Sequence, residues 1–259
     1  MNNGYIIEYN VSGCSFDFQI NRLPFDRKKN LALKSEKLAN RWLTKGLNNF
    51  NVQLLPIKVD TEIKDDAYFR IQIFRCQVVD GNLLNREEFL HFETPDFAEY
   101  RKTLNNTPLI TYPLSGSFET ELDYTNGIFD GFQQISPEKL EIEAFYKKVH
   151  GLFQDKNKKG LLDLMELRIK EYAKSVYRDI ESEYERQDSI LENMFSRSIF
   201  PLDLEKFQVL TYLDNKLFCL EDLKGNSPLK FRDEELEVFV YYPFYIGKSI
   251  QNGQWLIGF

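Results

Sequence analysis

The sequence has few of the residues that most often carry catalysis or metal binding. Its 259 residues include only two histidines and three cysteines, and no Cys-x-x-Cys pair occurs. There is no Gly-x-Ser-x-Gly nucleophile motif and no glycine-rich loop of the kind that holds phosphate. Acidic residues occur as neighbours along the chain, and neighbouring side chains in strands usually point apart instead of converging on one ion. We therefore expect no catalytic residue, no bound metal and no cofactor.

The two histidines, His91 and His150, lie in a strand-like segment and near the end of an expected helix, respectively. General acid–base catalysis by histidine needs a partner within hydrogen-bond distance, and no motif supplies one. A histidine near the carboxyl end of a helix is explained by the helix dipole. We expect a structural or surface role for both.

Cysteines are sparse and odd in number, which predicts a reducing compartment and no disulfide framework. Cys14 and Cys219 lie in apolar, strand-like contexts, so we expect them to be buried and unreactive. The start of the chain lacks the basic and then apolar stretches of a signal peptide. No apolar run approaches the roughly 20 residues of a membrane-spanning helix. These features predict a cytoplasmic protein.

Basic residues are fewer than acidic residues in this chain. The chain has 33 Lys and Arg residues against 40 Asp and Glu residues, which gives a net charge of −7. An acidic protein is repelled by phosphate backbones and by anionic membranes. We therefore expect neither nucleic acid nor a membrane as partner, and the charge is compatible with a basic protein partner.

Aromatic residues, in contrast, are plentiful, with 22 Phe and 14 Tyr in a chain that is 42% hydrophobic. Large aromatic side chains mostly fill cores. The length and composition suit two domains, which we place at residues 1–133 and 134–259. The pattern of short strands around one helical region predicts an α+β fold that is mainly β.

The first domain reads as repeated short strands. Apolar and polar residues alternate in Tyr5–Ile20, which is divided by Ser12-Gly13, and again in Ala67–Val79. Asn21–Asn30 contains a proline and several charges and is expected to be a loop. Leu31–Trp42 is ambiguous, and within it Lys34–Asn40 suits one or two helical turns. Repeated strands with turns between them predict an antiparallel β-sandwich.

One short passage supports the sandwich. Trp42-Leu43 and Lys45-Gly46 are followed by Asn48 and then by an alternating strand through Phe50, Val52 and Leu54. This order resembles a passage of jelly-roll and immunoglobulin-like sandwich modules. The resemblance covers about a dozen residues of the sequence and implies a sandwich, without implying sugar binding.

A helical region follows. Ser136, Pro137 and Glu138 form a start signal, and the apolar stripe of the first helix consists of Ile142, Phe145, Val149, Leu152 and Phe153. Lys156 to Gly160 is expected to be the turn that ends it. A second, longer helix is expected from Leu161 to Tyr184, and a short third helix over Asp188–Phe195.

Antiparallel hairpins are expected after the helices, at Asp214-Asn215 and at Gln251-Asn252-Gly253. The opening helix, with Phe145-Tyr-Lys-Lys-Val149, and the final strand, Gly253-Gln-Trp255-Leu-Ile257, make residues 136–259 similar to the NTF2-like (SnoaL-like) fold. That resemblance implies a curved sheet around a cone-shaped pocket. The family includes isomerases and dehydratases as well as non-catalytic binding modules. Its enzymes typically carry an Asp or His in the pocket, and neither aligns to a motif here.

The most distinctive local feature is the aromatic run around Pro243, which breaks the sheet ladder. Its side chains either pack in the core or form a recognition patch of the kind that anchors protein interfaces. The candidate binding residues are Tyr241, Tyr242, Phe244 and Tyr245.

These observations favour a non-catalytic protein-binding protein. Bacterial immunity proteins, which bind and neutralise a secreted toxic effector, are often acidic, soluble and short of catalytic residues, and the chain fits that class by analogy. One alternative is a small-molecule binding protein or enzyme that uses an NTF2-like pocket, which predicts a concave apolar cavity with one or two polar groups. Another is a structural or assembly component of a secretion or phage system. The sequence specifies neither the partner's identity nor the oligomeric state.

Overall fold

The computed structural model describes residues 2–28, 33–57, 60–79 and 82–259. Within them lie four α-helices and four antiparallel sheets, which confirms an α+β fold that is mainly β. The chain divides into two compact units. The first contains Met1–Thr125 and Ser175–Tyr177, and the second contains Asn126–Lys174 and Arg178–Phe259. The expected domain boundary between residues 133 and 134 falls inside the second unit. No helix of the described part is long and apolar enough to cross a bilayer.

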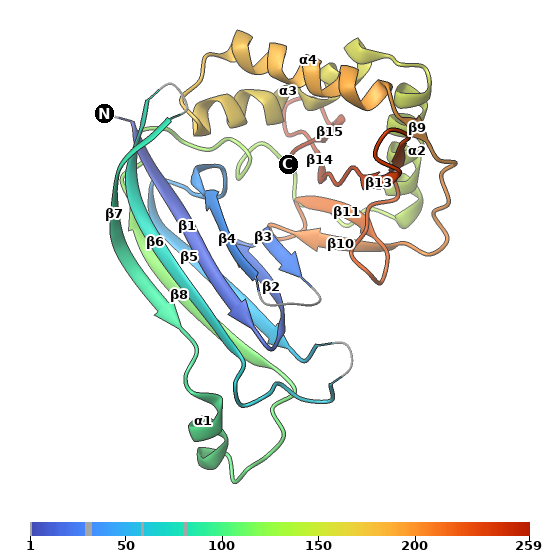
Figure 1. Cartoon of the computed structure of the whole chain (residues 1–259). Helices are drawn as coiled ribbons and strands as arrows, with labels where there is room; N and C mark the ends of the chain where they lie inside the picture. The colour runs from blue at the N-terminus through green and yellow to red at the C-terminus, as the bar shows by residue number, and fades with distance from the viewer. Residues whose placement is uncertain (1, 29–32, 58–59, 80–81) are drawn as a thin grey trace. The chain divides into compact units, whose positions relative to one another are not determined.

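The first unit is built from two four-stranded antiparallel sheets, with strand orders β4-β1-β6-β7 and β3-β2-β5-β8 (Figure 1). A short 3-10 helix, Asn40–Trp42, precedes β5, and α1, Phe97–Thr103, connects β7 to β8. The strands are β1 (Asn3–Ser12), β2 (Ser15–Ile20), β3 (Leu23–Lys28), β4 (Leu33–Leu38), β5 (Gly46–Leu55), β6 (Tyr68–Val79), β7 (Asn82–Glu93) and β8 (Tyr112–Thr120).

Aromatic rings join the two sheets of the first unit. Phe69 of β6 meets the ring edge of Phe16 of β2 at 5.1 Å between centroids. Phe50 of β5 meets Phe92 of β7 at 4.7 Å. Each contact links one sheet to the other, and such edge-to-face pairs are favourable beyond the area they bury. The two antiparallel sheets therefore pack as a sandwich, as the alternating strands predict.

The passage from Trp42 to Asn48 closes tightly before β5. Asn48 is fully buried, and its amide group donates to the carbonyl oxygens of Thr44 and Gly46 at 2.9 and 2.8 Å. Its side-chain oxygen accepts from the Thr44 backbone N–H at 2.8 Å. Gly46 has a φ of 89°, which a residue without a Cβ adopts most readily. The wider likeness to jelly-roll and immunoglobulin-like modules stays a prediction.

Two expectations for the first unit are wrong. Leu23–Lys28, within the expected loop, is strand β3, while residues 29 and 30 lie outside the described residues. Asn21 and Arg22, with φ of 50° and 65°, form the tight turn from β2, and Pro24 is tolerated because β3 is an edge strand with a register shift beside it. The helical turns expected in Lys34–Asn40 are instead strand β4, which pairs with β1.

The second unit contains α2 (Lys139–Gln154), α3 (Lys158–Ser175) and α4 (Ile180–Phe195). The predicted apolar stripe of α2 is buried except for Leu152, which is half-buried. The helix begins after Glu138, its N-cap, and not at Ser136. The turn between α2 and α3 is shorter than expected, because α3 already begins at Lys158. Gly160 lies inside α3, and its backbone N–H donates to Asn157 Oδ1 at 2.9 Å.

The expected long helix from Leu161 to Tyr184 is wrong, because the chain breaks between α3 and α4. Tyr177 has a φ of 51°, which no helical residue adopts. Asp179 then caps α4 by accepting the Ser182 N–H at 2.9 Å. Two contacts show that α3 and α4 run antiparallel: Lys158, at the start of α3, pairs with Glu192 near the end of α4, whereas Tyr172, late in α3, stacks under the earlier α4 residue Arg186.

The strands of the second unit form two antiparallel sheets, with orders β10-β11-β14-β15 and β13-β12-β9. Both predicted hairpins are confirmed, since Asp214, Asn215 and Gly253 have φ of 54°, 62° and 69° at their turns. The likeness to the NTF2-like fold stays a prediction. The strands are β9 (Ser198–Ile199), β10 (Gln208–Tyr212), β11 (Leu217–Glu221), β12 (Lys230–Asp233), β13 (Val238–Tyr241), β14 (Ile246–Lys248) and β15 (Trp255–Ile257).

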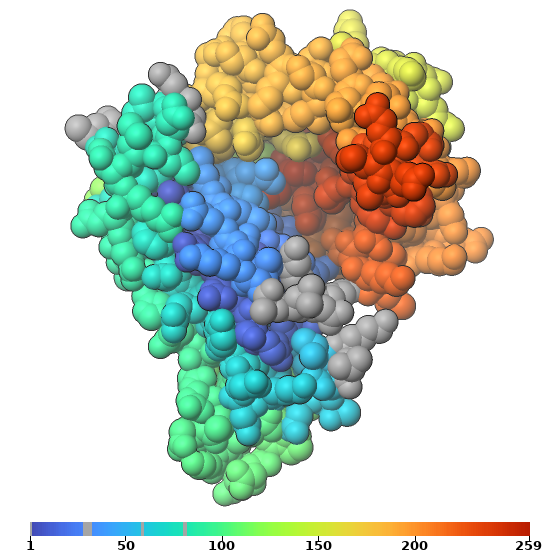
Figure 2. Space-filling view, viewed as in Figure 1, coloured from blue at the N-terminus to red at the C-terminus, as the bar shows by residue number. Residues whose placement is uncertain are grey.

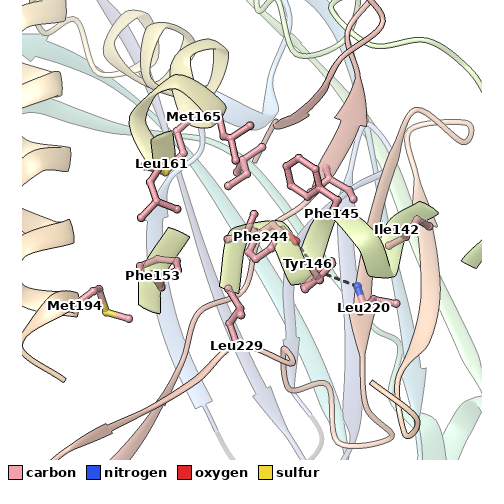
Figure 3. Packing of buried hydrophobic residues seen from close by; sticks show 14 of the residues in the cluster. Ile142, Phe145, Tyr146, Phe153, Leu161, Met165, Met194, Leu220, Leu229 and Phe244 are labelled. Atoms are coloured by element: carbon pink, nitrogen blue, oxygen red, sulfur yellow. Dashed lines mark hydrogen bonds between the residues drawn. The ribbon is translucent and has the colours of Figure 1, made fainter. Parts of the chain in front are cut away.

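Tyr146 of α2 is at the centre of the second unit's core (Figure 3). Its ring stacks on Phe244 at 4.5 Å between centroids. Its hydroxyl accepts the backbone N–H of Leu220 at 3.0 Å and donates to the Phe244 carbonyl at 3.3 Å. Complete burial raises the pKa of Tyr146 well above its ordinary value. One side chain thus fixes α2 against β11 and against the segment that leads into β14.

Candidate functional site

The aromatic run after β12 is divided between core and surface. Phe244 is 1% exposed and belongs to the core. Tyr242 is half-buried, with its hydroxyl 3.3 Å from Arg168 Nη1. Tyr245 is half-buried against the rings of Tyr212 and Phe259. Of the four predicted binding residues, only Tyr241 is exposed, at 37%.

The pairing of β12 with β13 explains why Tyr241 faces outward. Opposite residues of an antiparallel pair share a face, and successive residues alternate between faces. Phe231 pairs with Val240, and both lie on the core side. Tyr241 pairs with Lys230, one position along, and so lies on the opposite side of the sheet.

That side also carries four residues that, with Tyr241, form what we call the outer face: Phe200, Lys230, Arg232 and Phe239. Lys230 Nζ lies 3.8 Å from the ring centroid of Phe239, 4.7 Å from that of Phe200 and 6.0 Å from that of Tyr241. Each such contact stabilises an ammonium by about 0.5–2 kcal/mol. Phe239 is nevertheless 53% exposed. The β12–β13 segment forms the orange-red part of the surface in Figure 2.

The backbone of β13 also faces solvent along one side. β13 is the terminal strand of its sheet, and within the described residues no strand pairs with its second side. The Tyr242 N–H donates to the Leu229 carbonyl at 2.9 Å, which sets the alternation of the ladder. By that alternation Val240 bonds to β12, whereas the N–H and C=O groups of Phe239 and Tyr241 point to the open side.

Sequence reasoning missed most of this surface. Phe200 directly follows β9, Lys230 begins β12 and Phe239 lies in β13, and both β9 and β12 are too short to recognise by alternation. A usable signal was the uncharged run Val238–Tyr241, set between Glu237 and Pro243. Such a run at an exposed edge is unusual, because edge strands normally carry charges or prolines.

The two histidines lie on different elements, His91 on β7 and His150 on α2. His150 is mostly buried, and its Nε2 lies 2.9 Å from the carbonyl oxygen of Phe200, which is a structural contact. His91 is exposed on β7, with Nε2 3.4 Å from a Glu93 carboxylate oxygen. Across the described ranges, no group of three or more His, Cys, Asp or Glu residues is arranged to hold a metal ion.

All three cysteines are buried, and none of them forms a disulfide. This confirms that Cys14 and Cys219 are buried. Burial raises the pKa of Cys14 to about 12 and that of Cys76 to about 11. Since the thiolate is the reactive form, these two thiols are inert at neutral pH while the protein is folded.

A cavity of about 450 Å³ lies in the second unit between α3 and the turn that joins β14 to β15. Its lining is mainly polar. Of its three carboxylates, two have partners: Glu171 accepts the Gly127 N–H at 2.7 Å and bonds Lys174 at 2.6 Å, while Glu166 pairs with Lys170. The cavity therefore differs from the apolar pocket that a small-molecule function predicts.

The chain matches no protein-family model, no curated protein and no solved structure.

Proposed function

We propose that this chain is a non-catalytic protein-binding protein, and that it contacts its partner through the outer face and the open edge of β13. The observation that carries this proposal is the exposure of Phe239 and Tyr241 around Lys230, on a strand with one unpaired edge. Aromatic residues and cations are the usual anchors of protein interfaces, and an open edge adds backbone hydrogen bonds.

Within that class we favour a bacterial immunity protein that acts in the cytoplasm and neutralises a secreted toxic effector by direct binding. The net charge of −7 supports a partner with basic regions, because complementary charge speeds encounter and disfavours wrong partners. Tight, stoichiometric binding by a rigid strand edge would suffice for inhibition, so no chemistry by this chain is required.

The test is an affinity purification of the tagged protein from its native host, read by mass spectrometry. Phe239→Glu places a charge on the outer face and should remove a specific partner from the recovered proteins. Leu84→Glu is the matched control, because Leu84 is also an exposed apolar residue, 46% exposed, on the edge strand β7 of the first unit. It should leave recovery unchanged.

A stoichiometric partner with a toxic or hydrolytic domain, lost only from the Phe239→Glu variant, would support the immunity function. Equal recovery by both variants would contradict the proposed surface. If the protein is recovered alone, and native mass spectra show a retained small molecule, the protein-binding function is wrong and the cavity beside α3 becomes the candidate site.

A further inference from the structure

Lys230 lacks an acidic partner on the outer face. No carboxylate oxygen of the described residues lies within 4.0 Å of its Nζ, which contacts three aromatic rings instead. Its neighbours are different. Arg232 pairs with Glu234 at 3.1 Å, and Arg197 pairs with Asp233, also at 3.1 Å. Lys230 is thus the cation that remains available at this surface, and it is held in place by the rings around it.

The open side of β13 sets the shape of what can bind beside it. The outward N–H and C=O groups of Phe239 and Tyr241 are spaced as in any antiparallel ladder, so they accept an extended segment that adds as a further strand. Val238–Tyr241 carries no charge and no proline that would oppose such addition. Side chains of the added strand would alternate between the core side and the outer face.

We propose that the partner contributes an extended segment that pairs with the open edge of β13 and places an Asp or Glu side chain on the outer face, where its carboxylate bonds Lys230. This inference rests on the proposed protein-binding function and specifies its chemistry. The rings of Phe239 and Tyr241 would flank the ion pair and limit its access to water, which strengthens a charge-assisted hydrogen bond.

A second copy of this chain fits the edge less well. Its own β13, Val238–Tyr241, contains no acidic residue, so a strand-to-strand dimer would leave Lys230 without a carboxylate. Charge complementarity therefore favours a different protein with an acidic, otherwise apolar strand over self-association.

The experiment uses the full chain as bait for random peptides displayed on phage, each long enough to pair with the whole of β13. We expect the selected peptides to share one Asp or Glu among alternating apolar residues. For a synthetic peptide from that selection, Lys230→Gln should weaken binding by about tenfold or more. Changing the peptide's acidic residue to its amide should cause the same loss, and the two changes together should cause little further loss. Lys206→Gln, at a solvent-exposed lysine of the same unit, is the control and should have no effect.

Backbone pairing has its own test. N-methylation of the peptide at alternate positions should abolish binding, and at the intervening positions should be tolerated, because only every second N–H faces β13. Equal sensitivity at all positions would overturn strand addition.

Three results would overturn the inference as a whole: no peptide is selected, the selected peptides lack an acidic residue, or Lys230→Gln binds them as well as the original chain. A dimer in sedimentation that dissociates in the Phe239→Glu variant would also overturn it, since a second copy would then occupy the edge. If the purified host partner is lost with Phe239→Glu but is indifferent to Lys230→Gln, the proposed function stands and only the acidic segment is wrong.

Discussion

β7 of the first unit and β13 of the second are both terminal strands of their sheets, yet their surfaces differ. β7 carries four charged residues, Arg86, Glu87, Glu88 and Glu93, and its Arg86 bonds Glu8 at 3.0 Å and Glu36 at 2.6 Å across the sheet. β13 has no charged residue, and its aromatic side chains are exposed. Charges on an edge strand prevent the addition of foreign strands. The charges on β7 oppose strand addition at that edge, whereas the edge of β13 carries no charge that would oppose it.

The largest effect expected near β13 is on stability, and it distinguishes the core residue Phe244 from the surface residue Tyr241. Phe244→Ala should lower the free energy of unfolding by about 3–5 kcal/mol, because it leaves a cavity beside Tyr146. Tyr241→Ala should change it by about 1 kcal/mol or less, because that ring is partly solvated. Urea denaturation measures both. Similar losses for the two variants would mean that the aromatic run is not divided between core and surface.

A second comparison sets the two edges against each other directly. Phe239→Glu should weaken binding of the recovered partner by about 2–4 kcal/mol, the cost of losing a central aromatic anchor. Leu84→Glu on β7 should change binding little, because that edge already carries charge. Isothermal titration calorimetry gives both values, and circular dichroism checks that each variant is folded. A loss with Leu84→Glu as large as that with Phe239→Glu would show that the edges do not differ in role.

A smaller effect on stability is expected from the core of the second unit, at the buried hydroxyl of Tyr146. Tyr146→Phe keeps the stacked ring but removes the hydroxyl that accepts the Leu220 N–H. Leaving that buried donor unpaired should cost about 1–3 kcal/mol of stability. Partner affinity measured well below the unfolding transition should stay the same, since Tyr146 does not reach the outer face. Reduced affinity in the folded variant would show instead that the core controls the binding surface.

The smallest effect concerns the charges that close β7. Lys34, together with Arg86, lowers the pKa of Glu8 below its ordinary value of 4.5, although burial acts in the opposite direction. A carboxyl whose pKa is depressed on folding stabilises the folded state above its unfolded pKa, and that stability is lost as pH falls through the folded pKa. Glu8→Gln should therefore lower stability at neutral pH and converge with the original chain in acid. Thermal unfolding measured from pH 7 to pH 3 tests this, and a constant difference between the two proteins would contradict it.

Local signals account for much of the fold. Alternation predicted β1, β2, β5 and β6, and the residues that adopt positive φ predicted the turns before β11 and β15. In these segments the preference of each residue agrees with its neighbours and with the pairing partner. Local and tertiary forces then give the same answer, and the sequence pattern is sufficient.

Where local signals and tertiary contacts compete, the prediction failed. β4 carries alternating charges that suit a helical turn, but pairing with β1 decides its conformation. The apolar stripe of α3 continues past Ser175, but the capping of α4 by Asp179 breaks it. Neither the strand partner nor the position of a competing cap can be read from periodicity alone.

The candidate site was predictable only in outline. The aromatic run includes one residue of the candidate site, Tyr241, but its three other residues face or border the core. Lys230 and Phe200 join the surface through strand pairing between segments about 30 residues apart in the sequence. Which residues of two such distant segments pair with each other depends on tertiary contacts. The spacing of residue types along one sequence does not specify that register.

The buried thiols allow the opening of each unit to be measured separately. Cys14 and Cys76 lie in the first unit and Cys219 lies in the second. A thiol reagent modifies each cysteine only during the moments when its surroundings open, so the rate of labelling reports how often that region unfolds. Mass spectrometry of labelled peptides can then rank the opening rates of the two units in the unmodified protein, and can show whether a bound partner slows one of them or both.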